Sequence, residues 1–185
     1  MDDALDKALA VFSERGYHAA SITDLTDAMG LAAGSVYKAF RDKRGIFLAA
    51  FDRYRALRIA LLDQATASTA TGRDKLRAVL GVYADSSYGD AGRRGCLVVR
   101  SAGDMALFDE EAARRVATAF AANEALVSGL IALGQEDGSI RDDLDAAATA
   151  RTLLCLMSGM RIVGKTGRSH ADMTDIAETA MKIID

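Results

Sequence analysis

Residues 21–51, SITDLTDAMGLAAGSVYKAFRDKRGIFLAAF, constrain the fold more than any other stretch of the chain. They predict two short helices joined by a tight turn, followed by a longer amphipathic helix. Ser21 and Asp24 have the spacing of a capping box, which satisfies free N–H groups at a helix start. Gly30 can adopt the left-handed backbone conformation that commonly ends a helix. The segment therefore predicts a helix-turn-helix.

The second helix of this pair is predicted to bury one face and expose the other. Val36 and Phe40 repeat at i, i+4 and are expected to be core positions. The other positions are small or polar, as a helix lying in the major groove of DNA requires. These outward residues are Ala33, Gly34, Ser35, Tyr37 and Lys38.

The segment resembles the DNA-binding part of TetR-type (TetR/AcrR) transcriptional repressors, specifically over residues 5–51. The matching positions are Gly30, Leu31, Gly34, Ser35, Val36, Tyr37, Phe40, Asp42, Lys43 and Phe47, preceded by Leu5, Ala8, Leu9, Phe12, Arg15, Gly16, Tyr17 and Thr23. The resemblance implies an all-α protein of about nine helices. Residues 1–45 would form a three-helix helix-turn-helix DNA-binding domain, and residues 46–185 a helical effector-binding and dimerisation domain.

The resemblance also implies the DNA contacts. Ser21 and Thr23 would bind phosphate oxygens at the start of their helix. Ala33, Gly34 and Ser35 would lie against base edges. Tyr37 and Lys38 would touch backbone or base, and Lys43 would bind a phosphate.

The sequence departs from the family pattern in two places. Ala32 and Ala33 stand where a Ser cap and a Lys are common, which removes a cap and a phosphate contact. Asp2, Asp3 and Asp6 replace a basic N-terminal arm, so minor-groove contacts from an arm are not expected. Non-specific DNA affinity should accordingly be modest.

Local charge agrees with a DNA footprint although the whole chain has a net charge of −3. A run of cations could also be an ordinary solvated helix face, and only its coincidence with the helix-turn-helix favours DNA. Between residues 31 and 58 the acids are Asp42 and Asp52, and the cations are Lys38, Arg41, Lys43, Arg44, Arg53, Arg55 and Arg58.

Composition favours helices throughout, because half of the residues are hydrophobic, alanine is abundant and proline is absent. Loops are expected at 65–72 and 89–95. The predicted helices are 2–15, 22–29, 33–39, 43 to the mid-60s, 73–87, 96–106, 110–136 (capped by Asp109), a helix from Asp145 to about 165, and 171–184.

The last two predicted helices carry more apolar surface than one core needs. The eighth is apolar nearly all round, so both of its sides must be covered, either by ordinary core packing or by a second subunit. TetR-type proteins dimerise through their last two helices. The predicted homodimer interface consists of Leu156, Gly159, Met160, Val163, Ile176, Ala177 and Ala180.

An effector pocket is expected among the fifth to eighth helices, where a lipophilic small molecule would fit the apolar lining. Each candidate residue could instead be ordinary core. Cys96 has two interpretations: a buried small apolar residue, or a reactive thiolate favoured by a helix N-terminus and nearby arginines that senses electrophiles or oxidants. The candidates are Tyr83, Cys96, Met105, Phe108, Phe120 and Met157.

Several classes of protein are not supported. Catalytic and nucleotide-binding motifs are absent, His18 and His170 lack neighbouring ligands, and the acidic runs precede predicted helices, so neither an enzyme nor a metal or other cofactor is expected. The N-terminus lacks the features of a secretory signal, and two cysteines make no disulfide framework, which predicts a cytoplasmic protein. The longest apolar run, 153–163, falls short of the ~18 residues that a membrane span needs.

The sequence thus predicts a homodimeric transcriptional regulator, a repressor released from a palindromic double-stranded DNA operator by a small lipophilic or electrophilic effector. The alternative is a helical protein–protein interaction module without a specific operator. A third interpretation, a helical hydrolase or lyase, has no catalytic residues to support it.

Overall fold

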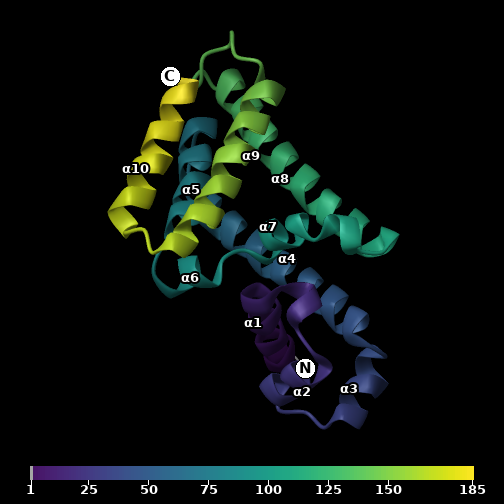
Figure 1. Cartoon of the computed structure of the whole chain (residues 1–185). Coiled ribbons are helices and arrows are strands. Elements are labelled where there is room, and N and C mark those ends of the chain that lie inside the picture. Colours follow the sequence, from purple (N-terminus) through teal and green to yellow (C-terminus); the bar gives the residue numbers. More distant parts are fainter. Residues whose placement is uncertain (1) are drawn as a thin grey trace. The chain divides into compact units, whose positions relative to one another are not determined.

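The computed structural model describes residues 2–185, and within that range it contains helices and turns without strands (Figure 1), as the sequence predicts. The α-helices are α1 (Asp2–Ala19), α2 (Ile22–Met29), α3 (Ala33–Phe40), α4 (Lys43–Ala67), α5 (Gly72–Asp85), α6 (Gly89–Arg94), α7 (Leu97–Gly103), α8 (Glu110–Glu136), α9 (Ala146–Val163) and α10 (His170–Met181). Three 3-10 turns accompany them: η1 (Met105–Leu107), η2 (Gly164–Thr166) and η3 (Lys182–Ile184).

The helix ends follow the predicted local chemistry. Ser21 and Asp24 form a complete capping box at α2, and Gly30 ends that helix with φ 66°. Asp145 accepts from the Ala148 N–H at the start of α9, and Asp109 caps α8 through its Oδ1. These local predictions are confirmed.

Two predicted boundaries are wrong. The segment expected as a loop at 89–95 contains the six-residue helix α6, whose first residue, Gly89, has φ 56°. The first helix runs on to Ala19, but Gly16 breaks its geometry with φ 82° and ψ 168°. Glycine adopts this positive φ without the steric penalty that a Cβ would bring.

The chain divides into two compact units. Unit 1 comprises Met1–Arg58 and Cys96–Ala117, and unit 2 comprises Ile59–Gly95 and Thr118–Asp185. Unit 1 therefore includes α7 and the start of α8 in addition to the three N-terminal helices. The functional boundary after residue 45 remains a prediction.

The core of unit 1 joins α1, α2, α3 and the first part of α4. Phe12 and Phe47 are fully buried and meet edge to face, with ring centroids 5.3 Å apart. Leu25 of α2 and Val36 of α3 are buried as well. Val36 is the only buried residue of α3, so the packing of Val36 in this core holds the short helix in place.

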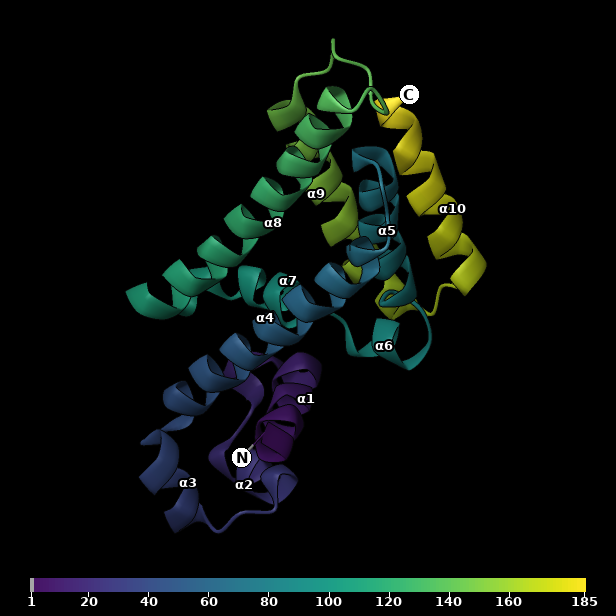
Figure 2. The ribbon, with the colours of Figure 1, turned by 180° about the vertical axis from the view of Figure 1, so that it is seen from behind.

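The core of unit 2 is formed by α5, α8, α9 and α10. Figures 1 and 2 show α5 lying side by side with α10. The buried residues include Leu80, Ile131 and Leu153. Three residues predicted for the dimer interface, Met160, Ala177 and Ala180, also belong to this core, where they are 2%, 5% and 3% exposed. They face their own chain, so the prediction that they meet a second subunit is wrong for these three.

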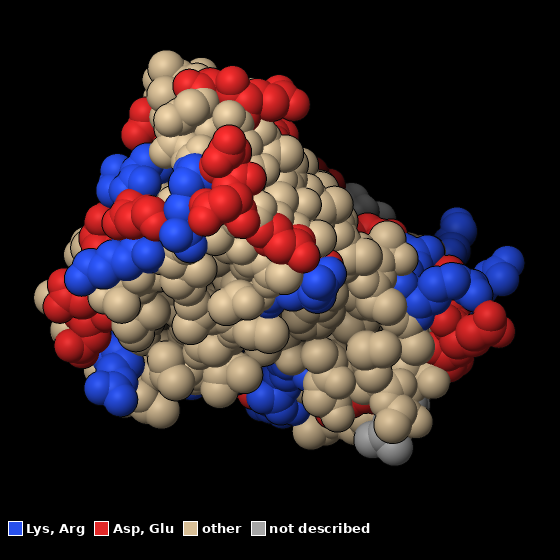
Figure 3. All heavy atoms as spheres, turned by 90° about the horizontal axis from the view of Figure 1, so that it is seen from above, with Lys and Arg blue, Asp and Glu red and all other residues tan. Residues whose placement is uncertain are grey.

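Apolar side chains remain exposed on α9. Leu156, Ile162 and Val163 are 36%, 57% and 37% exposed. Seen from above, uncharged areas lie between groups of mixed positive and negative side chains (Figure 3). Two helical segments, Glu110–Glu136 and Ala146–Thr166, are long and apolar enough to cross a membrane by length and composition alone. Core helices of soluble proteins meet the same criterion, so this is weak evidence for a membrane protein.

Close helix packing in unit 2 requires the glycine at position 72 of α5 but not the glycine at position 81. A Cβ on Gly72 would lie 2.5 Å from the Gly134 Cα and 2.6 Å from the Leu130 carbonyl oxygen, whereas a Cβ on Gly81 would have no neighbour within 4 Å.

We predict that Gly72→Ala lowers the free energy of unfolding by ~1–3 kcal/mol, because the added methyl meets backbone atoms that cannot move aside. Gly81→Ala, the matched control in the same helix, should raise it by about 0.5–1 kcal/mol, since alanine loses less chain entropy on folding. Urea denaturation followed by circular dichroism measures both. Equal effects of the two substitutions would contradict this description of the packing.

Candidate DNA interface

The outer face of α3 carries the predicted contact residues. Ala33, Gly34, Ser35, Tyr37 and Lys38 are all exposed, whereas Val36 between them is 1% exposed. Their exposure is confirmed, and their contact with DNA remains a prediction. Small side chains at the start of the helix allow its backbone to approach base edges closely.

The start of α3 lacks a side-chain cap, as the alanine there predicts. Ala32 is the N-cap residue and makes no side-chain hydrogen bond, although its carbonyl accepts from the Ser35 N–H at 2.9 Å. Free N–H groups at a helix start favour a nearby anion. The first turn of α3, which has no side-chain cap, is therefore suited to an anionic ligand in front of it.

A sharp reversal connects α3 to α4. Arg41 has φ 68°, the only positive φ of a non-glycine residue in the described chain, and the Asp42 N–H donates to the Phe40 carbonyl across it at 2.9 Å. Asp42 then accepts from the Gly45 N–H at 2.7 Å and caps α4. Gly45 is required here because a Cβ would collide with the Phe40 carbonyl. Sequence reasoning missed this turn, which places Lys43 shortly after the end of α3.

Lys43 is held by the end of α1. Its Nζ lies 4.6 Å from the centroid of the Tyr17 ring and 3.5 Å from the His18 carbonyl oxygen. Burial raises the pKa of Tyr17 above its usual value. The ammonium group thus has a defined position at the start of α4, as a phosphate contact would need.

At the start of α2, the two predicted phosphate-binding residues differ. The Ser21 hydroxyl donates to Asp24 Oδ2 at 2.8 Å and accepts from the Asp24 N–H at 3.0 Å, so the capping box occupies it. Thr23 is exposed on the first turn. Thr23 is therefore the better placed of the two hydroxyls to bind a phosphate oxygen.

Acidic partners reduce the basic footprint that the sequence predicts. Arg44 pairs with Asp109 at 2.6 Å and with Glu111 at 2.5 Å, and its hydrogen bond holds the pKa of Asp109 well below the usual range. Arg53 pairs with Asp6 at 2.5 Å and lowers the pKa of that carboxyl. These two arginines are paired within unit 1, so fewer cations of the run are available to DNA than the seven that the sequence counts.

The residues predicted for the effector pocket do not share one unit. Tyr83, Phe120 and Met157 belong to unit 2, where Tyr83 and Met157 are buried in the core. Cys96, Met105 and Phe108 belong to unit 1. Phe108 packs on the rings of Tyr17 and Phe47, and Cys96 Sγ accepts a hydrogen bond from the Tyr54 hydroxyl at 3.1 Å. A common pocket remains a prediction.

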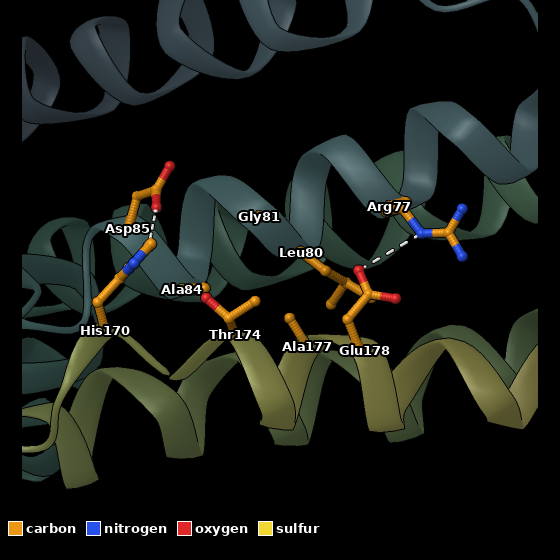
Figure 4. A pocket seen from close by; sticks show the side chains of 9 residues that line it. All are labelled: Arg77, Leu80, Gly81, Ala84, Asp85, His170, Thr174, Ala177 and Glu178. Atoms are coloured by element: carbon orange, nitrogen blue, oxygen red, sulfur yellow. Dashed lines mark hydrogen bonds and ion pairs between the residues drawn. The ribbon is translucent and has the colours of Figure 1, made fainter. Parts of the chain in front are cut away.

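Unit 2 has a groove of about 240 Å³ between α5 and α10 (Figure 4). A polar contact joins the two helices at each end: His170 Nε2 lies 2.8 Å from Asp85 Oδ1, and Arg77 forms an ion pair with Glu178 at 3.5 Å. The floor between these contacts consists of Leu80, Gly81, Ala84, Thr174 and Ala177. None of the residues predicted for the effector pocket lines it, and no cluster of three metal-binding side chains occurs within residues 2–185.

Two family models match the chain. Residues 4–50 match the model described as bacterial regulatory proteins, tetR family. Residues 72–180 match the model described as tetracyclin repressor-like, C-terminal domain. Between them the matches include the candidate interface, α5 to α9 and most of α10.

Known proteins of similar sequence and structure are transcriptional regulators. The chain is 27% identical over 184 residues to the HTH-type transcriptional repressor ComR of Escherichia coli (strain K12), covering 98% of this chain and 87% of that protein. A cysteine-substituted form of the TetR family regulator CifR, solved with 26-bp double-strand operator DNA, has a TM-score of 0.87 and 25% identity, covering 100% of this chain and 96% of that one. A TetR family regulator from Agrobacterium tumefaciens has a TM-score of 0.88 at 19% identity, covering 99% and 96%, and shows the fold. Such regulators are not enzymes, as expected.

We predict that Lys43→Ala and Tyr37→Ala weaken binding to all DNA duplexes about equally, whereas Ser35→Ala changes the preference between sequences. Losing one lysine–phosphate contact should reduce the slope of log affinity against log salt by about one. Fluorescence anisotropy over a salt titration measures this slope. If Lys43→Ala left it unchanged, Lys43 would not contact DNA.

Proposed function

The chain belongs to the TetR family of bacterial regulatory proteins, and on this basis we propose that it is a cytoplasmic, homodimeric repressor that binds a palindromic operator and is released by a small effector. The observation that carries the proposal is the outer face of α3. Its contact residues are exposed, its inner residue Val36 is buried, and Lys43 is fixed beside its end.

Operator binding is supported by the chemistry of this face. Ser35, Tyr37 and Lys38 can contact bases and backbone, while Ala33 and Gly34 allow close approach. The similar structure of CifR was solved with operator DNA, and the similar ComR is named as a repressor. Repression is the simplest consequence of occupying an operator.

The homodimer is proposed to form through the exposed apolar face of α9. Leu156, Gly159, Ile162 and Val163 recur at helical spacing on this face. Covering it with the same face of a second copy gives a two-fold symmetric contact. The two α3 helices would then read half-sites about one DNA turn apart, ~34–36 Å. Ile176 on α10 is half-buried and lies outside this proposed patch.

Selection of bound duplexes from a random DNA pool tests the proposal. We predict an enriched inverted repeat for the full chain. Ile162→Arg, which places a charge on the exposed face, should yield a monomer by sedimentation and enrich single half-sites only. Gln64→Arg, at an exposed position of α4 and outside the proposed patch on α9, is a control for added charge. No enrichment by the full chain would support the interaction module instead.

The effector is proposed to act through α4 and Cys96. The helix α4 is 25 residues long, ~37 Å, and its residues belong to both units. A tilt of α4 by bound effector would move α3 away from its half-site. Cys96 is partly exposed and contacts Tyr54 of α4, so an electrophile attached to its sulfur would disturb that contact.

We predict that N-ethylmaleimide, used as an electrophilic probe, weakens operator binding ~5- to 150-fold, the range of typical coupling between sites. The Cys155→Ser variant, which removes the exposed second thiol, should retain this response, and Cys96→Ser should lose it. Mass spectrometry reports the extent of modification and anisotropy the affinity. Complete modification of Cys96 with unchanged affinity would exclude an electrophilic effector at this thiol.

A further inference from the structure

The break in α1 at Gly16 is stabilised from another helix. The backbone turns out of helical geometry at Gly16, which leaves carbonyl groups of the preceding turn without their usual helical partners. Arg100 of α7 donates from Nη2 to the Arg15 carbonyl oxygen at 2.8 Å. A residue 85 positions away in sequence thus supplies the missing donor.

Any side chain at the break would force the Arg100 guanidinium out of this position. A Cβ on Gly16 would lie 2.7 Å from Arg100 Nε and 2.8 Å from Arg100 Nη2. Arg100 Nε is also one of only two buried side-chain nitrogen or oxygen atoms in the described chain that lack a hydrogen-bond partner. An unpaired buried donor lowers the stability of the folded protein. The guanidinium occupies this position in spite of that cost.

The residues after the break hold the predicted phosphate contact. Tyr17 packs against Phe47, with ring centroids 5.0 Å apart, and offers its ring face to Lys43 Nζ. The His18 carbonyl oxygen lies 3.5 Å from the same nitrogen. Because Tyr17 and His18 follow Gly16 directly, the direction of the chain at the break decides where Lys43 is held.

We propose that Arg100 is a positioning residue for DNA binding: it fixes the break in α1 and thereby holds Lys43 where it meets a phosphate. The part of this proposal that concerns DNA rests on the proposed function, because it takes Lys43 to contact a phosphate. All of the groups belong to unit 1. DNA affinity would therefore depend on α7 as well as on the helices of the helix-turn-helix.

The first test needs no DNA. Lysine amines of the full chain are ¹³C-methylated, and the Lys43 signal is identified with Lys43→Arg. We expect this signal to be shifted upfield by the Tyr17 ring, and Arg100→Met to remove most of the shift. Arg100→Lys, which keeps a donor for the Arg15 carbonyl, should restore part of it. A Lys43 signal unmoved in folded Arg100→Met would overturn the proposal.

The second test is a double-mutant cycle on a duplex selected by the full chain. Arg100→Met should reduce the slope of log affinity against log salt by up to about one. In a chain that already carries Lys43→Ala, Arg100→Met should cause no further reduction of this slope. Arg114→Met is the matched control, because this exposed arginine of unit 1 pairs with Glu110 in the next turn of its own helix; its effect should add to that of Lys43→Ala. Equal effects of Arg100→Met with and without Lys43 would overturn the proposal.

Failure of the proposed function gives a different result. If Lys43→Ala itself leaves the slope unchanged while Arg100→Met still moves the Lys43 signal, the positioning role stands and the phosphate contact fails. Circular dichroism melting establishes that each variant is folded. Arg100→Gln, which is too short to reach the Arg15 carbonyl, repeats both tests if Arg100→Met does not fold.

Discussion

The candidate interface depends on the aromatic packing of unit 1. An eight-residue helix such as α3 is not stable alone in water, and α3 buries only Val36 fully. Phe12 and Phe47 form the core beside it, and Tyr17 and Phe108 extend the same ring contacts. Full burial of one such side chain contributes ~1.5–3 kcal/mol. The helix α3 can therefore expose most of its surface because its neighbours supply the packing.

Ion pairs within the protein determine which lysine and arginine side chains remain available to bind DNA phosphates. Acidic residues that replace a basic N-terminal arm have a structural role, since Asp2 and Asp6 both pair with Arg53. Asp109 both caps α8 and binds Arg44. A charge count along the sequence cannot detect these partners, because they lie 47 and 65 positions away. The basic footprint is accordingly smaller than the count predicts.

Local features were predictable from the sequence and long-range ones were not. The capping box at Ser21, the left-handed Gly30 and the exposed face of α3 depend on residues within a few positions, so spacing alone reveals them. The burial of Met160, Ala177 and Ala180 could not be read in this way, because a helix with apolar residues on two sides does not reveal which side meets its own core. The contact between Arg100 and the Arg15 carbonyl gives no sequence signal, since an arginine on a short helix is ordinarily solvated.

We propose above that the outer face of α3 is the surface that reads DNA. Amide hydrogen exchange of the full chain, with and without a duplex that it has selected, tests this directly. If this face reads DNA, the duplex should slow exchange in residues 21–45, with the largest change in the first turn of α3, which has no side-chain cap in the free protein. Unchanged exchange across residues 33–40, with protection confined to another part of the chain, would contradict it.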